Sequence, residues 1–370
     1  MNNVICQFEI HKLHIPVGRY IGDSMCHYDA FRTVVVRLLT TGGDVGWGFG
    51  EKAYGGHFAK EASWDRPVPP PAELEQQFLA RYWARLEGRS ATGFKFATPE
   101  LADGDDGLAM ALRMALWDLI GKEAGLPLFR LLGGPGVRGS IRAYASACEF
   151  PMPDEFLSEF YERKAREGFR AFKIKIGHDD QERDLRRLRL TREIVGMDAS
   201  LAADANKAWT AEQTVERIGF FNRQGINLAY IEDPLEPADL DGYRHLAAHC
   251  PIPVVGHDYV PYPADMRPLL ETGALAMLRA RTGLDYGLGL LPLAREFNKP
   301  MIGTNTLFEW GIHFALAFAE VDRVEYSDQD WNLLPKTPVQ IKDGMMSAPE
   351  TPGHGFEPNP EIFEQWKINE

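Results

Sequence analysis

From about residue 138 onward, short apolar segments alternate with longer amphipathic ones, and this repetition restricts the fold more than any other feature. Eight segments have the length and apolar content of buried strands, at 142–147, 171–176, 200–204, 228–232, 253–256, 276–280, 300–304 and 323–326. Helical patterns fill most of the gaps, for example at 154–168, 179–197, 211–224 and 286–297. The repetition predicts a parallel α/β barrel with its chemistry at the carboxyl ends of the strands. The alternative, an open doubly wound sheet, lacks a Gly-rich phosphate loop after its strands.

The first 137 residues are organised differently. Strand patterns at 4–16, 31–39 and 44–52 precede helical patterns near 73–87 and 107–124, which predicts a separate α+β domain. We place its boundary at 137, the barrel at 138–330, and a final segment at 331–370. That proline-containing segment is expected to return to the first domain.

Composition narrows the class of protein. The chain is 45% apolar and 25% charged, and we find neither an apolar run of about 18 residues nor a signal-peptide core, so we expect a cytoplasmic protein. The net charge of −13 argues against nucleic acid or anionic membrane as a partner, but not against a small anionic substrate. The four cysteines are scattered without a C-x-x-C pair, which argues against a structural zinc site and against a disulfide framework.

The segment 171–176 carries two lysines in a strand pattern. A period of two places Lys173 and Lys175 on one face. Like charges held close together, and burial, both favour loss of a proton, so one lysine is a candidate general base. The alternative is an edge strand whose lysines face solvent.

Acidic residues end the next three predicted strands. Asp204, Glu232 and Asp258 would converge at the barrel mouth, with Asn206 beside them. Three carboxylates cannot stay ionised and close together without a cation, and a site made only of oxygens favours Mg²⁺. The alternative is that each acid caps the helix that follows it.

Two stretches resemble a known family. The helix and exit that contain Trp117, Asp118 and Gly121 resemble the end of the capping domain in the enolase superfamily, mandelate racemase-like branch. In that branch a K-x-K strand precedes three acidic metal ligands. The intervals from Lys175 to Asp204, on to Glu232 and on to Asp258 are 29, 28 and 26 residues. The resemblance covers nearly the whole chain and implies a capping domain on a modified (β/α)7β TIM barrel.

The resemblance also implies roles for these residues. Lys175 would remove the proton α to a carboxylate, and Lys173 would tune it and touch that carboxylate. Asp204, Glu232 and Asp258 would hold Mg²⁺, and Asn206 would line the site. The third ligand is usually Glu in this family, so the shorter Asp258 is the least certain ligand, and His257 is its candidate substitute.

The chain departs from the family at the sixth and seventh strands. Arg281 stands where an Asp is expected, and Thr304 and Asn305 stand where a His is expected, so the His–Asp dyad is absent. We interpret Arg281 as an anion clamp, since arginine stays protonated, or else as half of a structural salt bridge. Thr304 and Asn305 are candidates for hydrogen bonds to a substrate hydroxyl. Glu325 matches an acidic position that in the family partners the substrate carboxylate, or it simply pairs with Arg279 or Arg281.

The substrate class follows from the resemblance. Loops near 19–23 and 54–57 are candidate lids, with Tyr54 and His57 as substrate-binding residues. With one base and no opposing dyad, elimination is favoured over racemisation, so we predict a homo-oligomeric Mg²⁺-dependent dehydratase acting on small sugar acids, an aldonate or aldarate. Epimerisation, racemisation or cycloisomerisation is the nearest alternative, and a catalytically silent binding protein is the alternative from another class.

Overall fold

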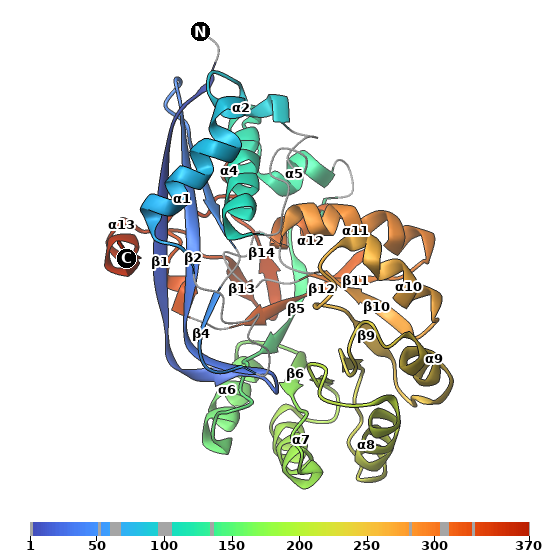
Figure 1. The fold of residues 1–370 in the computed structure, drawn as a ribbon. Helices are drawn as coiled ribbons and strands as arrows, with labels where there is room; N and C mark the ends of the chain where they lie inside the picture. The colour runs from blue at the N-terminus through green and yellow to red at the C-terminus, as the bar shows by residue number, and fades with distance from the viewer. Residues whose placement is uncertain are drawn as a thin grey trace.

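A computed structural model describes residues 3–50, 53–59, 68–94, 106–133, 137–280, 283–303, 311–327 and 330–369. It has an N-terminal α+β domain beside a barrel that is ringed by helices (Figure 1). The α/β fold class predicted from the sequence, a TIM barrel with an N-terminal α+β domain, is therefore confirmed. In the described part of the chain, no helix is long and apolar enough to cross a bilayer.

The N-terminal domain is built on an antiparallel sheet in the order β15-β1-β2-β3, with β4 also paired to β2. Its strands are β1 (Ile5–Gly22), β2 (Cys26–Thr40), β3 (Val45–Phe49), β4 (Ala53–Ala59) and β15 (Lys367–Ile368). Its helices are α1 (Pro71–Phe78), which continues through a π turn into α2 (Ala84–Leu86), then α4 (Gly107–Ala124) and α5 (Leu128–Gly133). The first two strands are longer than the sequence indicates, so the candidate lid near residues 19–23 is the tip of a long hairpin.

Glycines fix how closely the sheet lies on α4. A β-carbon at Gly48 would lie 1.7 Å from the carbonyl oxygen of Ala111, and one at Gly46 would lie 2.5 Å from that of Ala115. Only glycine permits that approach. The contact packs β3 against a helix that is buried over most of its length.

The barrel strands run in chain order, and the last strand pairs in parallel with the first to close the ring. They are β5 (Ile141–Ser146), β6 (Ala171–Lys175), β7 (Ser200–Asp204), β8 (Ile231–Glu232), β9 (Val254–Gly256), β10 (Leu275–Arg279), β11 (Met301–Gly303) and β12 (Val321–Ser327). The surrounding helices are α6 (Asp154–Arg166), α7 (Gln181–Val195), α8 (Ala211–Arg223), α9 (Leu240–His249), α10 (Met266–Glu271), α11 (Leu284–Glu296) and α12 (Gly311–Ala317). Short 3₁₀ turns lie at Ala91–Phe94, Pro263–Asp265 and Asp330–Leu333.

An apolar layer fills the barrel interior below its mouth. It consists of Tyr144, Ala171, Ala202, Tyr230, Val255 and Ile302, with Met277 packed against them. Side chains alternate along a strand, so the residues two positions after four of these, Lys173, Asp204, Glu232 and Arg279, form the next layer toward the carboxyl ends. The charged layer at the barrel mouth therefore rests on a buried apolar layer.

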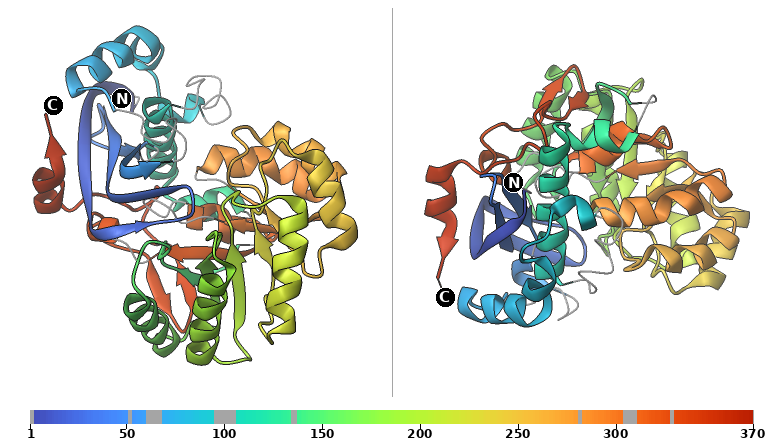
Figure 2. Two further views of the ribbon diagram at one scale, coloured as in Figure 1. Left: turned by 60° about the horizontal axis from the view of Figure 1, so that its bottom comes forward. Right: turned by 90° about the horizontal axis from the view of Figure 1, so that it is seen from above.

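The final segment lies along the N-terminal domain. After the hairpin of β13 (Gln340–Lys342) and β14 (Met345–Ser347), the chain reaches α13 (Pro360–Trp366) and then β15, which pairs with β1 at Lys12 and Leu13. Figure 2 shows α13 on the outer side of the N-terminal sheet.

Asp118 of α4 joins three parts of the chain. Its buried carboxylate accepts hydrogen bonds from the backbone N–H of Trp47 at 3.0 Å, the backbone N–H of His354 at 3.0 Å and Lys122 Nζ at 2.8 Å. The α4 motif noted in the sequence thus includes an anchor for the final segment.

We expect Asp118→Ala to lower the free energy of unfolding by about 3–5 kcal/mol, because it leaves buried donors and a lysine without their acceptor. Urea denaturation followed by circular dichroism measures the change. Asp241→Ala, at a carboxylate that is 96% exposed, is the control. A loss below about 1 kcal/mol would show that the anchor is dispensable.

A buried histidine makes stability depend on pH. His313 of α12 donates from Nε2 to the carbonyl oxygen of His354 at 2.8 Å, and its Nδ1 accepts from the N–H of Phe129 at 3.3 Å. Both ring nitrogens are therefore satisfied in the neutral form, and burial lowers the pKa of His313 to about 3. The unfolded chain takes up this proton near its ordinary pKa of about 6.5.

The contribution of His313 is complete above about pH 6.5 and is lost as the pH falls toward 3, because the unfolded state binds the extra proton there. We expect the urea midpoint to fall between pH 7 and pH 4, and to fall less steeply in His313→Gln. His249→Gln, at an exposed position, should keep the wild-type slope. Identical slopes for all three proteins would remove His313 as the cause.

Candidate active site

Strand register brings the two lysines and the first two acids together. Lys175 pairs with Asp204 on β7, and Asp204 pairs with Glu232 on β8. Every residue of β6 is buried, with Lys173 at 1% and Lys175 at 7% exposure. The edge-strand alternative for this segment is therefore wrong.

Carboxylates hold both ammonium groups. Lys173 Nζ lies 2.5 Å from Glu232 Oε1, 3.1 Å from Glu325 Oε1 and 3.3 Å from Asp204 Oδ2. Lys175 Nζ lies 2.6 Å from Asp204 Oδ2 and 3.0 Å from Asn206 Oδ1. The charged layer is thus a continuous network of ion pairs.

These pairs reverse the expected titration of the lysines. Burial lowers the pKa of Lys173, but the charges of Glu232 and Glu325 outweigh it and raise the pKa well above its usual range. Burial also lowers the pKa of Lys175, and Asp204 more than compensates, so the net shift is upward. The argument from crowding did not count the acids that face the lysines, and the role of Lys175 as the base stays a prediction.

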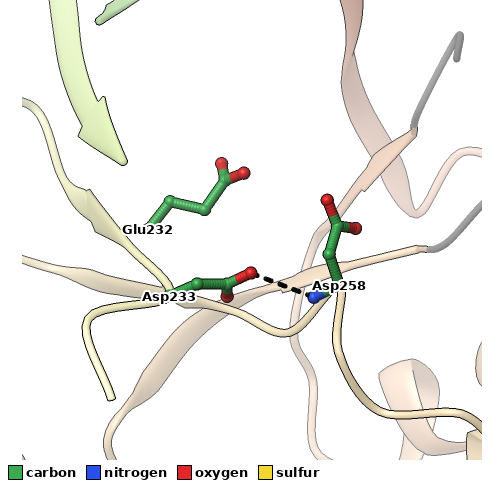
Figure 3. Close-up of side chains that lie close together, drawn as sticks. All are labelled: Glu232, Asp233 and Asp258. Atoms are coloured by element: carbon green, nitrogen blue, oxygen red, sulfur yellow. Dashed lines mark hydrogen bonds between the residues drawn. The ribbon is translucent and has the colours of Figure 1, made fainter. Parts of the chain in front are cut away.

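Three carboxylates form a group with the geometry of a cation site. Glu232, Asp233 and Asp258 each offer an oxygen within 4.8 Å of the others (Figure 3). One oxygen of each, Glu232 Oε2, Asp233 Oδ1 and Asp258 Oδ1, is buried without a hydrogen-bond partner among the described residues. Burial and the negative charges of Asp258 and Glu232 raise the pKa of Asp233 well above its usual range. Carboxylate oxygens from three residues gathered within this distance fit a hard divalent cation such as Mg²⁺.

This group differs from the set expected from the sequence by one member. Asp233 is the additional member. It directly follows Glu232 and has a left-handed backbone conformation, with φ 45°, which brings its side chain to the carboxylate group. Asp204 is turned toward the lysines, and its Oδ1 accepts the N–H of Asn206 at 3.0 Å. The role of Asp204 as a ligand stays a prediction.

His257 is engaged elsewhere. Its Nε2 hydrogen-bonds the carbonyl oxygen of Leu235 at 2.9 Å, and its Nδ1 lies 3.5 Å from Asp233 Oδ1. Burial lowers the pKa of His257 to about 4, so the ring is neutral at pH 7. Asp258, rather than His257, belongs to the carboxylate group.

Arg279 also belongs to the charged layer. From the sequence it was expected only as a candidate partner of Glu325. That pair is present, through a short contact of a guanidinium nitrogen with Glu325 Oε2. Arg279 Nε also lies 3.2 Å from Glu232 Oε1 and 3.3 Å from Asp258 Oδ2. The signal in the sequence was the period of two that places Arg279, after Met277, on the interior face of β10.

The loop that follows β7 contacts the loops that follow β8 and β9 and the N-terminal domain. The N–H of Lys207 donates to the carbonyl oxygen of Asp233 at 2.7 Å, and Asn206 Nδ2 donates to the hydroxyl of Tyr259 at 2.9 Å. Ser24 Oγ, from the turn between β1 and β2, donates to the carbonyl oxygen of Ala205 at 2.9 Å. The hairpin tip near residues 19–23 therefore adjoins the barrel mouth.

Other predicted site residues are not placed by the structure. Arg281, Thr304 and Asn305 lie outside the described residues. Tyr54 and His57 belong to β4, which pairs with β2, but their side chains lie outside the described part of the chain. Their proposed contacts with substrate stay predictions.

Comparison with known proteins assigns both halves of the chain. The sequence profile described as Enolase C-terminal domain-like matches residues 156–362. The profile of the mandelate racemase / muconate lactonizing enzyme N-terminal domain matches residues 21–133.

Relatives of similar length include enzymes of three reaction types. Arabinonate dehydratase of Saccharolobus solfataricus is 25% identical, over 90% of this chain and 90% of that protein. D-galactarolactone cycloisomerase of Agrobacterium fabrum is 28% identical, over 97% and 96% of the two chains. L-Ala-D/L-Glu epimerase of Bacillus subtilis is 25% identical, over 95% and 96%.

Solved structures agree with the fold. A candidate mandelate racemase from Mesorhizobium loti is 31% identical and superposes with a TM-score of 0.88, over 99% of this chain and 95% of that one. A racemase from Streptomyces coelicolor, solved with bound magnesium, is 22% identical with a TM-score of 0.82, over 99% and 100%. The chain belongs to the mandelate racemase and muconate lactonizing enzyme family of the enolase superfamily.

Proposed function

We propose that this protein is a Mg²⁺-dependent sugar-acid dehydratase, which removes the proton α to a carboxylate and then expels a β-hydroxyl as water. The observation that carries the proposal is the group of carboxylates of Glu232, Asp233 and Asp258 beside two buried lysines. A bound Mg²⁺ would stabilise the negative charge that develops when the α-proton leaves. Bound magnesium in the racemase from Streptomyces coelicolor supports this choice of cation.

The positions of the lysines support separate roles. Lys175 is the last residue of β6 and lies nearer the barrel mouth, so it is the better placed to reach a substrate carbon. Asn206 and Asp204 hold its ammonium group and so orient it. Lys173 lies one pleat deeper, where its charge favours an anionic substrate carboxylate.

Dehydration is favoured over epimerisation because the sequence offers no second base at the two dyad positions. Arg281 stays protonated at any working pH, and Asn305 does not titrate. The likeness to arabinonate dehydratase is in accord with this choice. The second candidate is cycloisomerisation, supported by the 28% identity with D-galactarolactone cycloisomerase.

The decisive test is incubation with Mg²⁺ and pooled aldonates and aldarates in D₂O, followed by mass spectrometry. A compound that loses one water and becomes a 2-keto-3-deoxy acid establishes dehydration and identifies the substrate. Deuterium uptake without loss of water points to epimerisation. Conversion of an aldarolactone, added to the same pool, into an isomer without loss of water points to cycloisomerisation. No change in any compound, together with no Mg²⁺ binding, would indicate a silent binding protein.

Lys175→Ala should lower turnover of the substrate found in that test by about 10²–10⁴-fold while Mg²⁺ binding is retained, because a general base contributes on that scale. Steady-state kinetics and calorimetry measure the two effects. Lys164→Ala, at another buried lysine, is the control because Lys164 pairs with Glu167 outside the charged layer. Undiminished turnover in Lys175→Ala would remove the base assignment.

Glu232→Gln and Asp258→Asn should each weaken Mg²⁺ binding by more than about 10-fold. Loss of a residue that only supports a metal ligand already weakens binding by about 10-fold or more, and loss of the ligand itself should cost at least as much. Calorimetric titration measures the affinity, with Glu320→Gln as a control at a carboxylate paired with Arg295. Wild-type affinity in both site variants would refute the metal site.

The same titration identifies the third ligand. The family resemblance predicts a loss of affinity in Asp204→Asn, and the place of Asp233 in the carboxylate group predicts one in Asp233→Asn. We expect the larger loss in Asp204→Asn, because Asp204 is the ligand that the resemblance implies. A larger loss in Asp233→Asn would transfer the role to Asp233.

A further inference from the structure

Arg279 is a cation of the protein itself, placed against the same carboxylates that form the candidate metal site. It ends β10, is 1% exposed, and its guanidinium reaches Glu232, Asp258 and Glu325. Its Nη1 also donates a hydrogen bond to the carbonyl oxygen of Gly303 at 3.2 Å. The guanidinium is thus fixed from two sides.

Without Arg279 the charged layer would be strongly negative. The ion-pair network contains the carboxylates of Asp204, Glu232, Asp258 and Glu325 and the cations Lys173, Lys175 and Arg279. Four acids against three cations leave these ion pairs one negative charge from neutral, and Asp233 of the carboxylate group adds a fifth acid beside them. Against the two lysines alone, the four paired acids would be left with two uncompensated charges.

The carboxylates of Glu232 and Asp258 contact Arg279 and also belong to the candidate metal site. Each presents one oxygen to Arg279 and leaves the other oxygen for a metal ion. Glu232 Oε1 and Asp258 Oδ2 lie at Arg279, while Glu232 Oε2 and Asp258 Oδ1 have no hydrogen-bond partner among the residues that the structure describes. A cation bound by those free oxygens would therefore share both carboxylates with the guanidinium. Two cations on the same carboxylates repel each other in a partly buried site.

We propose that Arg279 is the resident counter-cation of the carboxylate group: its charge balances the site when no metal is bound, and it limits the affinity of the site for Mg²⁺. The inference rests on the metal site of the proposed function and adds the residue that regulates it. Arg279 is a positioning and charge-balancing residue here, and no contact with substrate is assigned to it.

Arg279 could affect Mg²⁺ binding through its charge or by orienting the carboxylates, and the two effects change the affinity in opposite directions. If its main effect were to orient Glu232 and Asp258, its removal would weaken Mg²⁺ binding, as loss of an outer partner does elsewhere. If its charge dominates, removal strengthens binding. Repulsion between the guanidinium and a cation a few ångströms away in a partly buried site lowers the affinity for that cation by more than about 10-fold. We therefore expect the effect of charge to exceed the effect of orientation.

The test compares Arg279→Met and Arg279→Gln in the full chain. Met removes charge and hydrogen bonds, whereas Gln keeps an amide donor but removes the charge. Calorimetric titration with MgCl₂ should give at least about 10-fold tighter binding in both variants. The unfolding temperature should fall in EDTA and recover toward that of the wild type at saturating Mg²⁺. Arg192→Met is the matched control, because Arg192 is a buried arginine whose guanidinium bonds backbone carbonyls away from the site.

Each outcome distinguishes this inference from the proposed function. Wild-type protein that binds Mg²⁺ while Arg279→Met binds it equally or more weakly would overturn the role of Arg279 and leave the metal site standing. Wild-type protein that does not bind Mg²⁺ would overturn the metal site itself, and this inference with it. If Arg279→Met folds only when Mg²⁺ is present, the inference is supported. If it does not fold at all, the affinity of Arg279→Gln decides.

Discussion

Pairing of buried cations with carboxylates from neighbouring strands is the interaction on which the rest of this structure depends. Removing an ion from water costs several kcal/mol, and only close partners of opposite charge offset that cost. The barrel provides such partners because strand register is fixed along the ring, with Lys175 opposite Asp204 and Asp204 opposite Glu232. The chemistry of the site and the stability of the barrel mouth therefore involve the same side chains.

The apolar floor beneath this layer strengthens the pairing. Tyr144, Tyr230 and Ile302 are nearly fully buried one pleat below the charges. They exclude water, so the electrostatic interactions above them are weakly screened. Because side chains on the interior face of a strand recur every second residue, each short strand contributes one side chain to the apolar layer and the next to the charged layer.

The sequence predicted most of this arrangement where the signal is local. The K-x-K strand and the acids that end the next strands follow from a period of two and from the common direction of parallel strands, so Lys173, Lys175 and Glu232 were found in this way. Features that depend on geometry between elements were missed. Asp233 reaches the carboxylate group through a left-handed backbone conformation, and the titration of the lysines depends on acids from other strands. Arg279 was visible as an inward-facing residue, but the family pattern drew attention to Arg281 two positions later.

The pairing of β15 with β1 has a consequence for the order of folding during synthesis. Residues 367 and 368 complete a sheet whose other strands are made within the first 59 residues. While the ribosome still holds the end of the barrel, the edge of β1 at Lys12 and Leu13 is unpaired and Trp47 lacks its contact with His354. The N-terminal sheet thus emerges before the barrel and is completed after it, and a nascent chain exposes that open edge to neighbouring chains until residue 368 has emerged.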